Sequence, residues 1–247
     1  MEAVRNTWAI LKRELLSYFE SPVAYVFLIV SLMLMGFLTF FVNRFYEQGQ
    51  ADLRAFFVLC PWVFLLLVPA AGMRLWSEER RAGTIETLLT LPLTLTQAIV
   101  GKFVAAWIFV GLAVVLTFPL VLTTVYLGAP DKGVIIGGYA GSLLLAGTYL
   151  SVCMFTSALT RNQVISFVLS LVICLFMLLA GWPPVTDILD KWAAEWMVRA
   201  VAALSFMPHF ESIQRGVVDL RDILYYASVM IFMLCATHTV IQNRKAA

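Results

Sequence analysis

Six long stretches without a charged residue constrain this chain more than any other feature of its sequence. They run over Val23–Val42, Ala55–Met73, Phe103–Pro130, Gly133–Thr160, Asn162–Thr186 and Ile223–Asn243. A helix of about 20 apolar residues crosses the roughly 30 Å hydrocarbon core of a bilayer. Strands of a membrane barrel alternate apolar and polar residues, whereas these stretches are apolar on all sides. The sequence therefore predicts an all-α integral membrane protein with six transmembrane helices.

Composition supports this class and excludes others. Hydrophobic residues make up 62% of the 247 residues and charged residues 13%, whereas a soluble domain has about 45–50% and 25%. A soluble protein of this size cannot bury so much apolar surface. The net charge of +2 is too balanced to indicate nucleic acid as a partner. The four cysteines have no spacing typical of a metal site, so they are expected to be packing residues. The environment that the composition predicts is a lipid bilayer.

The segment before the first stretch, residues 1–21, has the pattern of a helix that lies in the membrane interface. Basic residues fall on one side of such a helix. The other side carries an apolar stripe formed by Val4, Trp8, Leu11, Leu15, Tyr18 and Phe19. An amphipathic helix of this kind is expected in the plane of the membrane surface. We expect Ser21-Pro22 to turn the chain into the first span.

The distribution of lysine and arginine predicts how the spans are oriented. With six spans, ten of the 17 basic residues fall on the side that holds the two termini, the segment 74–102 and Arg161, and seven on the other side. Basic residues are enriched on the cytoplasmic side of membrane proteins. Both termini and the segment 74–102 are therefore expected in the cytoplasm, and the segment 182–222 outside it.

No motif indicates that this chain catalyses a reaction or supplies its own energy. There is no GxxxxGK[ST] loop for ATP, and the spans hold no HExxH motif, GxSxG motif or paired carboxylates. A proton-driven carrier needs ionisable groups at mid-membrane. We therefore expect a protein that is not an enzyme, and any transport to draw its energy from a partner.

The segment 74–102 has the pattern of a short helix that begins at Thr84. Thr84 is a suitable N-cap, and Glu86 places a negative charge in the first turn. Ile85, Leu88 and Leu89 share one apolar face, because they are spaced i, i+3 and i+4. Such a face can dock into a groove of a partner protein. It can also pack against the membrane bundle, and the residues alone leave both interpretations open.

The same segment resembles a known family. Residues 79–86 read E-R-R-A-G-T-I-E, which resembles the E-R-x-x-G-T-x-E signature of ABC-2 type exporter permeases. Leu-Leu-Thr-Leu-Pro at 88–92 and Gly101-Lys102 continue that match. Residues 14–25 and 208–222 resemble the branch called the gliding-motility-associated permease subunit, which is also similar to permeases placed beside copper-enzyme maturation genes. The resemblance covers essentially the whole chain.

This resemblance implies one ABC-2 membrane domain over residues 1–247 with a type V exporter-like fold. Its parts are an interfacial helix over 1–21, a cytoplasmic coupling loop over 74–102 and an extracytoplasmic segment with re-entrant helices over 182–222. It also implies a bacterial cytoplasmic (inner) membrane, a second permease subunit of the same or another kind, and a dimer of ABC ATPase subunits that carries ATP and Mg. A periplasmic auxiliary protein is a further candidate partner. No cofactor or metal is expected in this chain.

The resemblance also implies roles for residues of the loop. The expected ATPase-docking set is Glu79, Arg80, Gly83, Thr84, Ile85, Glu86, Leu88 and Leu89. Glu79 is expected to be a hinge contact that transmits the motion of the ATPase, although a charge at a helix end needs no such role. Gly83 permits the turn before Thr84, because glycine accepts backbone conformations that other residues avoid.

A charged cluster in the outer segment is a second candidate site. His209, Glu211, Arg215 and Asp219 form it, followed by Arg221 and Asp222. Such a cluster can bind a substrate or a metal, but alternating charges on an exposed segment are more often simply solvated.

The function expected from these observations is an exporter permease energised by a separate ATPase. The alternative is a permease-like mechanotransmitter or assembly factor that couples a cytoplasmic ATPase to a periplasmic machine without transporting a substrate. Ser166 and Ser170 are among the few polar groups of the fifth stretch. A lipidic or amphiphilic substrate is therefore more natural than an ion.

Overall fold

The computed structural model describes residues 2–46, 52–83, 94–191, 195–217 and 219–243, and every regular element among them is a helix. In chain order these are α1 (Glu2–Glu20), α2 (Pro22–Phe37), the π-helical turn η1 (Leu38–Val42), α3 (Arg54–Gly72), α4 (Ser77–Ala82), α6 (Leu95–Val115), α7 (Phe118–Leu127), α8 (Lys132–Leu159), α9 (Gln163–Leu179), α10 (Pro183–Leu189), α11 (Glu195–Ala202), α12 (Met207–Gln214) and α13 (Leu220–Asn243).

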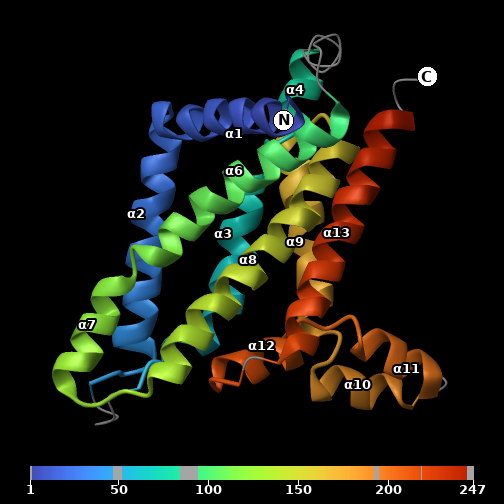
Figure 1. Cartoon of the computed structure of the whole chain (residues 1–247). Coiled ribbons are helices and arrows are strands. Elements are labelled where there is room, and N and C mark those ends of the chain that lie inside the picture. The colour runs from blue at the N-terminus through green and yellow to red at the C-terminus, as the bar shows by residue number, and fades with distance from the viewer. Residues whose placement is uncertain (1, 47–51, 84–93, 192–194, 218, 244–247) are drawn as a thin grey trace.

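The bundle has two distinct ends (Figure 1). Helix α1 lies across one end beside α4, and the last turn of α13 is at the same end, so the first and last helices meet the same side of the bundle. The short helices α10, α11 and α12 gather at the opposite end, which also holds the turn that joins α7 to α8. The described parts of the expected loop 74–102 and of the expected segment 182–222 thus lie at opposite ends of the bundle.

Helix α8 is the centre of the packing. It contacts α3, α6, α9, α12 and α13, and most of its second half is buried. Small residues allow the close approach: a Cβ atom added at Gly138 of α8 would lie 2.3 Å from the ring of Phe57 on α3. At the other end of α3, a Cβ atom at Gly72 would lie 2.6 Å from the Cβ of Cys153. Side chains at either glycine would push α3 away from α8.

Among the residues that the structure describes, five helical segments are long and apolar enough to cross a membrane. They are Pro22–Val42, Arg54–Ala82, Leu95–Leu127, Lys132–Leu159 and Leu220–Asn243. The fifth expected span is shorter than its charge-free stretch: α9 has 17 residues, about 26 Å of helix at 1.5 Å per residue. It ends before Gly181, and Pro183 and Pro184 begin the separate helix α10, because proline at the start of a helix cannot continue the preceding one.

The third expected span is also interrupted. Helix α6 ends at Val115 and α7 begins at Phe118. Pro119 lies in the first turn of α7 and has no backbone N–H to continue the preceding ladder. The Thr117 hydroxyl satisfies part of this break by donating to the carbonyl of Val114, at 2.6 Å.

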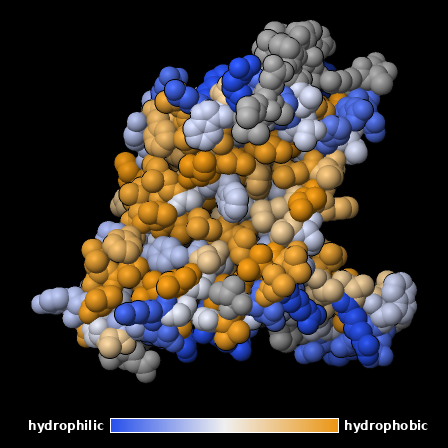
Figure 2. Space-filling model, in the orientation of Figure 1, coloured by the Kyte–Doolittle hydropathy of each residue, from blue (hydrophilic) through white to orange (hydrophobic). Residues whose placement is uncertain are grey.

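An apolar belt surrounds the bundle. Figure 2 shows hydrophobic side chains over the middle of the visible face and hydrophilic side chains at the two ends. The first and last spans, which contain α2 and α13, contribute much of this belt, since only 22% of the first span and 17% of the last are buried within the chain. Large exposed side chains such as Met33, Phe41 and Phe232 would be unfavourable in water. The chain is therefore a multi-pass membrane protein.

Helix α1 uses part of its apolar stripe to pack on α6. Leu11 and Tyr18 are buried, and the adjacent Ile10 lies so close to α6 that a Cβ atom at Gly101 would be 2.9 Å from its Cγ2. Trp8, in contrast, is 64% exposed. The stripe predicted for the membrane interface is thus divided between the protein and the surroundings.

Candidate functional site

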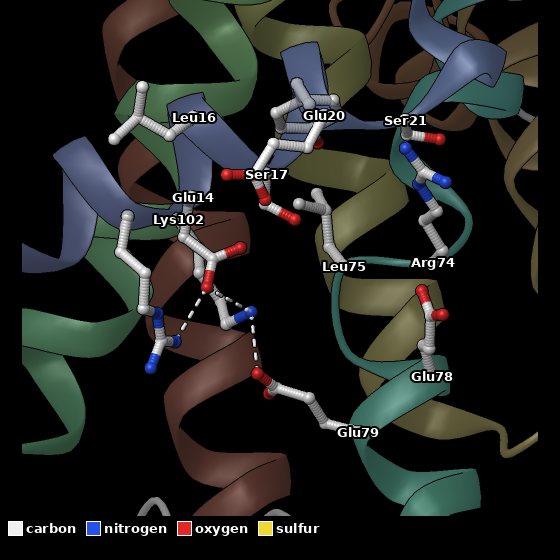
Figure 3. Close-up of a pocket in the computed structure, with 12 residues that line it drawn as sticks. Glu14, Leu16, Ser17, Glu20, Ser21, Arg74, Leu75, Glu78, Glu79 and Lys102 are labelled. Atoms are coloured by element: carbon white, nitrogen blue, oxygen red, sulfur yellow. Dashed lines mark hydrogen bonds and ion pairs between the residues drawn. The ribbon is translucent and has the colours of Figure 1, made fainter.

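A buried lysine lies at the junction of α1, α4 and α6 (Figure 3). Lys102, near the start of α6, is only 3% exposed. Its Nζ lies 2.8 Å from Oε1 of Glu79 on α4 and 3.2 Å from Oε1 of Glu14 on α1. A buried ammonium is tolerated only where carboxylates compensate it. These three residues, here called the ion triad, therefore tie three helices together at the end of the bundle that holds the termini.

Neighbouring groups reinforce the ion triad. The Arg13 guanidinium lies 2.8 Å from Oε1 of Glu14, and Nζ of Lys102 lies 5.3 Å from the ring centre of Trp76. Burial would raise the pKa of the Glu14 carboxyl, but the charges of Lys102 and Arg13 outweigh burial and hold this pKa below its ordinary value. Glu14 is therefore ionised at neutral pH and available to pair with Lys102.

The helical backbone is interrupted between α3 and α4, and one hydroxyl on α8 hydrogen-bonds to the backbone groups that the interruption leaves without helical partners. Oγ of Ser157 accepts from the backbone N–H groups of Trp76, at 2.9 Å, and Ser77, at 3.0 Å. It donates to the carbonyl of Met73, at 2.9 Å. A serine hydroxyl has one donor and two acceptor sites, so its capacity is filled. The junction that orients Glu79 is thereby fixed to the central helix.

Two further residues of the expected docking set lie beside this junction. The Arg80 guanidinium donates to the carbonyl of Ala158, in the last turn of α8, where the helix dipole favours a cation. Gly83 ends α4 with φ = 71°, the left-handed conformation that glycine adopts without steric cost. Five residues of the set lie outside the described residues: Thr84, Ile85, Glu86, Leu88 and Leu89.

The partners of Glu79 were not predicted from the sequence. Glu14 and Lys102 were parts of motifs without an assigned role, and Ser157 was not singled out. Two signals point to them in retrospect. Lys102 is the lone charge between two apolar runs of the same helix. Glu14 falls four residues after Ile10 and four before Tyr18, on the inward face of α1.

The outer cluster is divided into separate contacts. His209 Nδ1 lies 2.7 Å from Oδ1 of Asp222, and the His209 ring stacks on Tyr225 with 4.0 Å between ring centres. Glu211 pairs with Arg215 one helical turn away, at 3.4 Å. Asp219 accepts a hydrogen bond from the backbone N–H of Arg221 at the start of α13.

The contacts of His209 fasten α12 to α13, whereas the Glu211–Arg215 and Asp219–Arg221 contacts are local to the end of α12 and the start of α13. Two tyrosines of α13 strengthen the attachment: Tyr225 donates to the carbonyl of Leu204, at 2.6 Å, and Tyr226 to that of Phe206, at 3.0 Å. Within the ranges that the structure describes, no three His, Cys, Asp or Glu side chains are grouped to hold a metal ion. The four residues proposed from the sequence are thus not brought together as a set.

Comparison with known proteins places the whole bundle in one family. We found no match among curated proteins. The family model described as ABC-2 family transporter protein matches residues 8–237, which include the ion triad, the α3–α4 junction and the outer helices. This match covers nearly the whole chain, and it agrees with an all-helical structure that contains several helices able to span a membrane. The chain therefore belongs to the ABC-2 family of transporter proteins.

Proposed function

We propose that this chain is the transmembrane permease subunit of an ATP-binding-cassette exporter, energised by a separate ATPase subunit. Membership of the ABC-2 family supports the transporter class. The observation that carries the proposal is the ion triad, because it joins the base of the expected docking segment to two other helices. Glu79 lies five residues before Thr84, the first residue of the expected docking helix, and Lys102 links it to α1 and α6.

In the proposed mechanism, a displacement of α4 is passed to the rest of the bundle through two sets of contacts. One runs through Lys102 to α6 and α1, and the other through Ser157 to α8. Because α8 also contacts α3, α6, α9, α12 and α13, a displacement of α4 reaches most of the bundle. ATP can drive alternating access only if the ATP-bound partners favour one arrangement of these helices over another.

The proposed topology has six spans, with α9 as the sixth besides the five long helices. Both termini and the coupling loop 74–102 lie in the cytoplasm of a bacterium, α1 lies at the interface, and the helices within 182–222 re-enter the outer leaflet of the inner membrane. The domain extends over 1–247. The short α9 suits this arrangement, because α10 follows it directly and can complete the passage through the membrane.

The proposed partners are a dimer of ABC ATPase subunits and a second permease subunit, with a periplasmic auxiliary protein as a further partner. ATP hydrolysis belongs to the ATPase subunits, and this chain carries no cofactor. Residues 14–25 and 208–222 resemble the gliding-motility-associated branch, and we propose that this chain shares ancestry with it. This relationship assigns no role in motility.

The substrate that suits this bundle is lipidic or amphiphilic. Helices α3 and α9 contact each other. Apart from Arg54 at the start of α3, their exposed residues are apolar, including Trp62 and Leu66 on α3 and Val168 and Val172 on α9. Ser170 is fully buried and bonds with Thr156 on α8, so its hydroxyl faces the protein interior. An ion would find no polar lining along the exposed faces of these two helices.

The proposal is tested by placing two charges on the expected docking face. Leu88→Asp with Leu89→Asp should abolish retention of the ATPase subunit in a pull-down, since each unpaired charge buried in an apolar groove costs several kcal/mol. The matched control is Ala82→Asp with Thr96→Asp, at two exposed positions that flank the segment; it should leave retention unchanged.

Two outcomes contradict the assignment. If the Leu88/Leu89 variant reaches the membrane and still retains the ATPase normally, the docking face is wrong. If that variant fails to accumulate in the membrane while the control accumulates, the two leucines belong to the core of the bundle.

A further inference from the structure

A pocket of approximately 690 Å³ opens between α1, the α3–α4 junction and the start of α6 (Figure 3). Its size falls within the range of about 300–1,000 Å³ that is usual for small-molecule sites. The ion triad forms one wall. The remaining lining carries groups that the coupling mechanism described above does not use.

Three of these groups are suited to a phosphate. The Arg74 guanidinium reaches toward Ser21 and lies 5.6 Å from the ring centre of Tyr18. No carboxylate among the described residues forms an ion pair with Arg74, and the hydroxyls of Ser17 and Ser21 have no hydrogen-bond partner within that part of the chain. A guanidinium and two hydroxyls in one pocket are typical donors for phosphate oxygens.

The same pocket is suited to an ammonium group. Glu20 and Glu78 line it, are exposed and have no ion pair among the described residues. The lining as a whole contains three basic and four acidic residues, so its formal charge is −1. An anionic ligand gains less from this lining than a zwitterion that brings both a phosphate and an ammonium.

The position of the pocket indicates where such a zwitterion comes from. Ser21 directly precedes Pro22, the first residue of a helix that can span the membrane. Val23 and Val26 on that helix are apolar and mostly exposed. The pocket therefore lies at the depth of lipid headgroups, and acyl chains attached to a bound headgroup can continue along α2.

We propose that this pocket binds the headgroup of a phospholipid with a primary ammonium, such as phosphatidylethanolamine. The phosphate lies on Arg74, Ser17 and Ser21, and the ammonium faces Glu20 and Glu78. The bound lipid bridges α1 and the α3–α4 junction beside the ion triad. The composition of the membrane therefore influences how the helices pack at the end that holds the termini. The site belongs to this chain alone and does not depend on the proposed ATPase partner.

The test measures lipid retention by native mass spectrometry of the purified full chain in detergent. Phosphatidylethanolamine should be retained in preference to phosphatidylglycerol and phosphatidylcholine. Arg74→Gln should weaken its retention about tenfold, the effect of losing a charge-assisted contact. Arg161→Gln, at an exposed arginine in the turn between α8 and α9, is the matched control and should have no effect. Glu78→Gln should reduce the preference over phosphatidylglycerol while leaving binding measurable.

A second variant and a soluble competitor keep the test decisive. If Arg74→Gln does not fold, Ser17→Ala with Ser21→Ala removes two donors and leaves the Arg74–Tyr18 contact in place; it should weaken retention as well. Soluble phosphoethanolamine should compete poorly, because it lacks acyl chains. Equal competition would indicate a free phosphate ester instead of a lipid.

Two other results overturn the proposal. One is undiminished retention of phosphatidylethanolamine by a folded Arg74→Gln variant. The other is a variant that keeps its lipid but loses the ATPase subunit in a pull-down, because the pocket would then be a docking site for protein.

Discussion

The two ends of the bundle both gather charged side chains, but they pair them differently. At the end that holds the termini, Lys102 joins carboxylates from two helices that are far apart in the sequence. At the opposite end, Glu211 and Arg215 pair within one helical turn, with 43% and 68% of their side chains exposed. His209 and Asp222 are the partly buried exception, and they join α12 to α13.

The difference is one of energy: the buried ion triad holds helices in place, whereas the exposed Glu211–Arg215 pair contributes little to their arrangement. An exposed pair one turn apart contributes about 0.3–0.5 kcal/mol, because water and salt screen it. A buried pair cannot lose one partner without leaving an uncompensated charge in the protein interior. The end that holds the termini is therefore where a change of charge is expected to alter the packing of the helices.

The largest effect is expected from Lys102→Met. Arg13 still pairs with Glu14 in this variant, but the partly buried carboxylates of Glu14 and Glu79 lose the cation between them, so the free energy of unfolding should fall by about 3 kcal/mol, the lower end of the range for a broken buried pair. Lys132→Met, an exposed lysine at the opposite end, makes the same chemical change and should be nearly neutral. Denaturant unfolding in detergent measures both. Equal effects for the two variants would erase the contrast between the ends.

A smaller effect is expected from Ser157→Ala. The backbone N–H groups of Trp76 and Ser77 and the carbonyl of Met73 each lose a partner in a buried region. An unsatisfied buried group costs about 1–3 kcal/mol, and relaxation of the junction should hold the total near the lower half of that range. Ser228→Ala removes a hydroxyl that bonds only its own helix in an exposed position, and it serves as the control. A neutral Ser157→Ala would show that water can replace the hydroxyl.

The helices were largely predictable from sequence, and the exceptions have local causes. Charge-free apolar runs are a strong signal for membrane helices. Absence of charge, however, does not mark where a helix stops. Gly181 and the two following prolines end the fifth stretch early, and Pro119 interrupts the third. In both cases the sequence contained the breaking residues, but the hydrophobic signal runs through them.

The candidate site was less predictable, because its contacts join distant segments. Glu79 belonged to a recognisable motif, whereas its pairing with Lys102 depends on how α4 packs against α6. The outer cluster was predicted from proximity in the chain, and proximity in the chain yields local pairs such as Glu211–Arg215. No local pattern in the sequence specifies Ser157, whose role comes from the packing of α8 against the α3–α4 junction.

A smaller effect is expected for the pH dependence of stability, which tests the ion triad at the end that holds the termini. The pKa of Glu14 lies below its ordinary value because Lys102 and Arg13 outweigh the effect of burial. A carboxyl with a lowered pKa stabilises the folded state above its ordinary pKa, and this contribution is lost as the pH falls through the lowered value. Stability should therefore decline below about pH 4.5. Glu14→Gln should make this decline shallower, while Glu211→Gln should not; identical profiles would mean that Glu14 is not coupled to Lys102.

The smallest effect is expected at the exposed pair, where a double-mutant cycle compares the two ends directly. Glu211→Gln, Arg215→Gln and the double variant should give a coupling energy of about 0.3–0.5 kcal/mol. Because salt screens exposed charges over a few ångströms at high ionic strength, 1 M salt should reduce this value toward zero. The corresponding cycle on Glu79 and Lys102 should retain most of its coupling energy, since buried charges are screened much less. A coupling energy above about 1 kcal/mol at the outer pair would mean that the pair is embedded in a contact the isolated chain lacks. The end that holds Glu211 and Arg215 would then be an interface in the assembled transporter. Strongly coupled charges would in that case occur at both ends of the bundle.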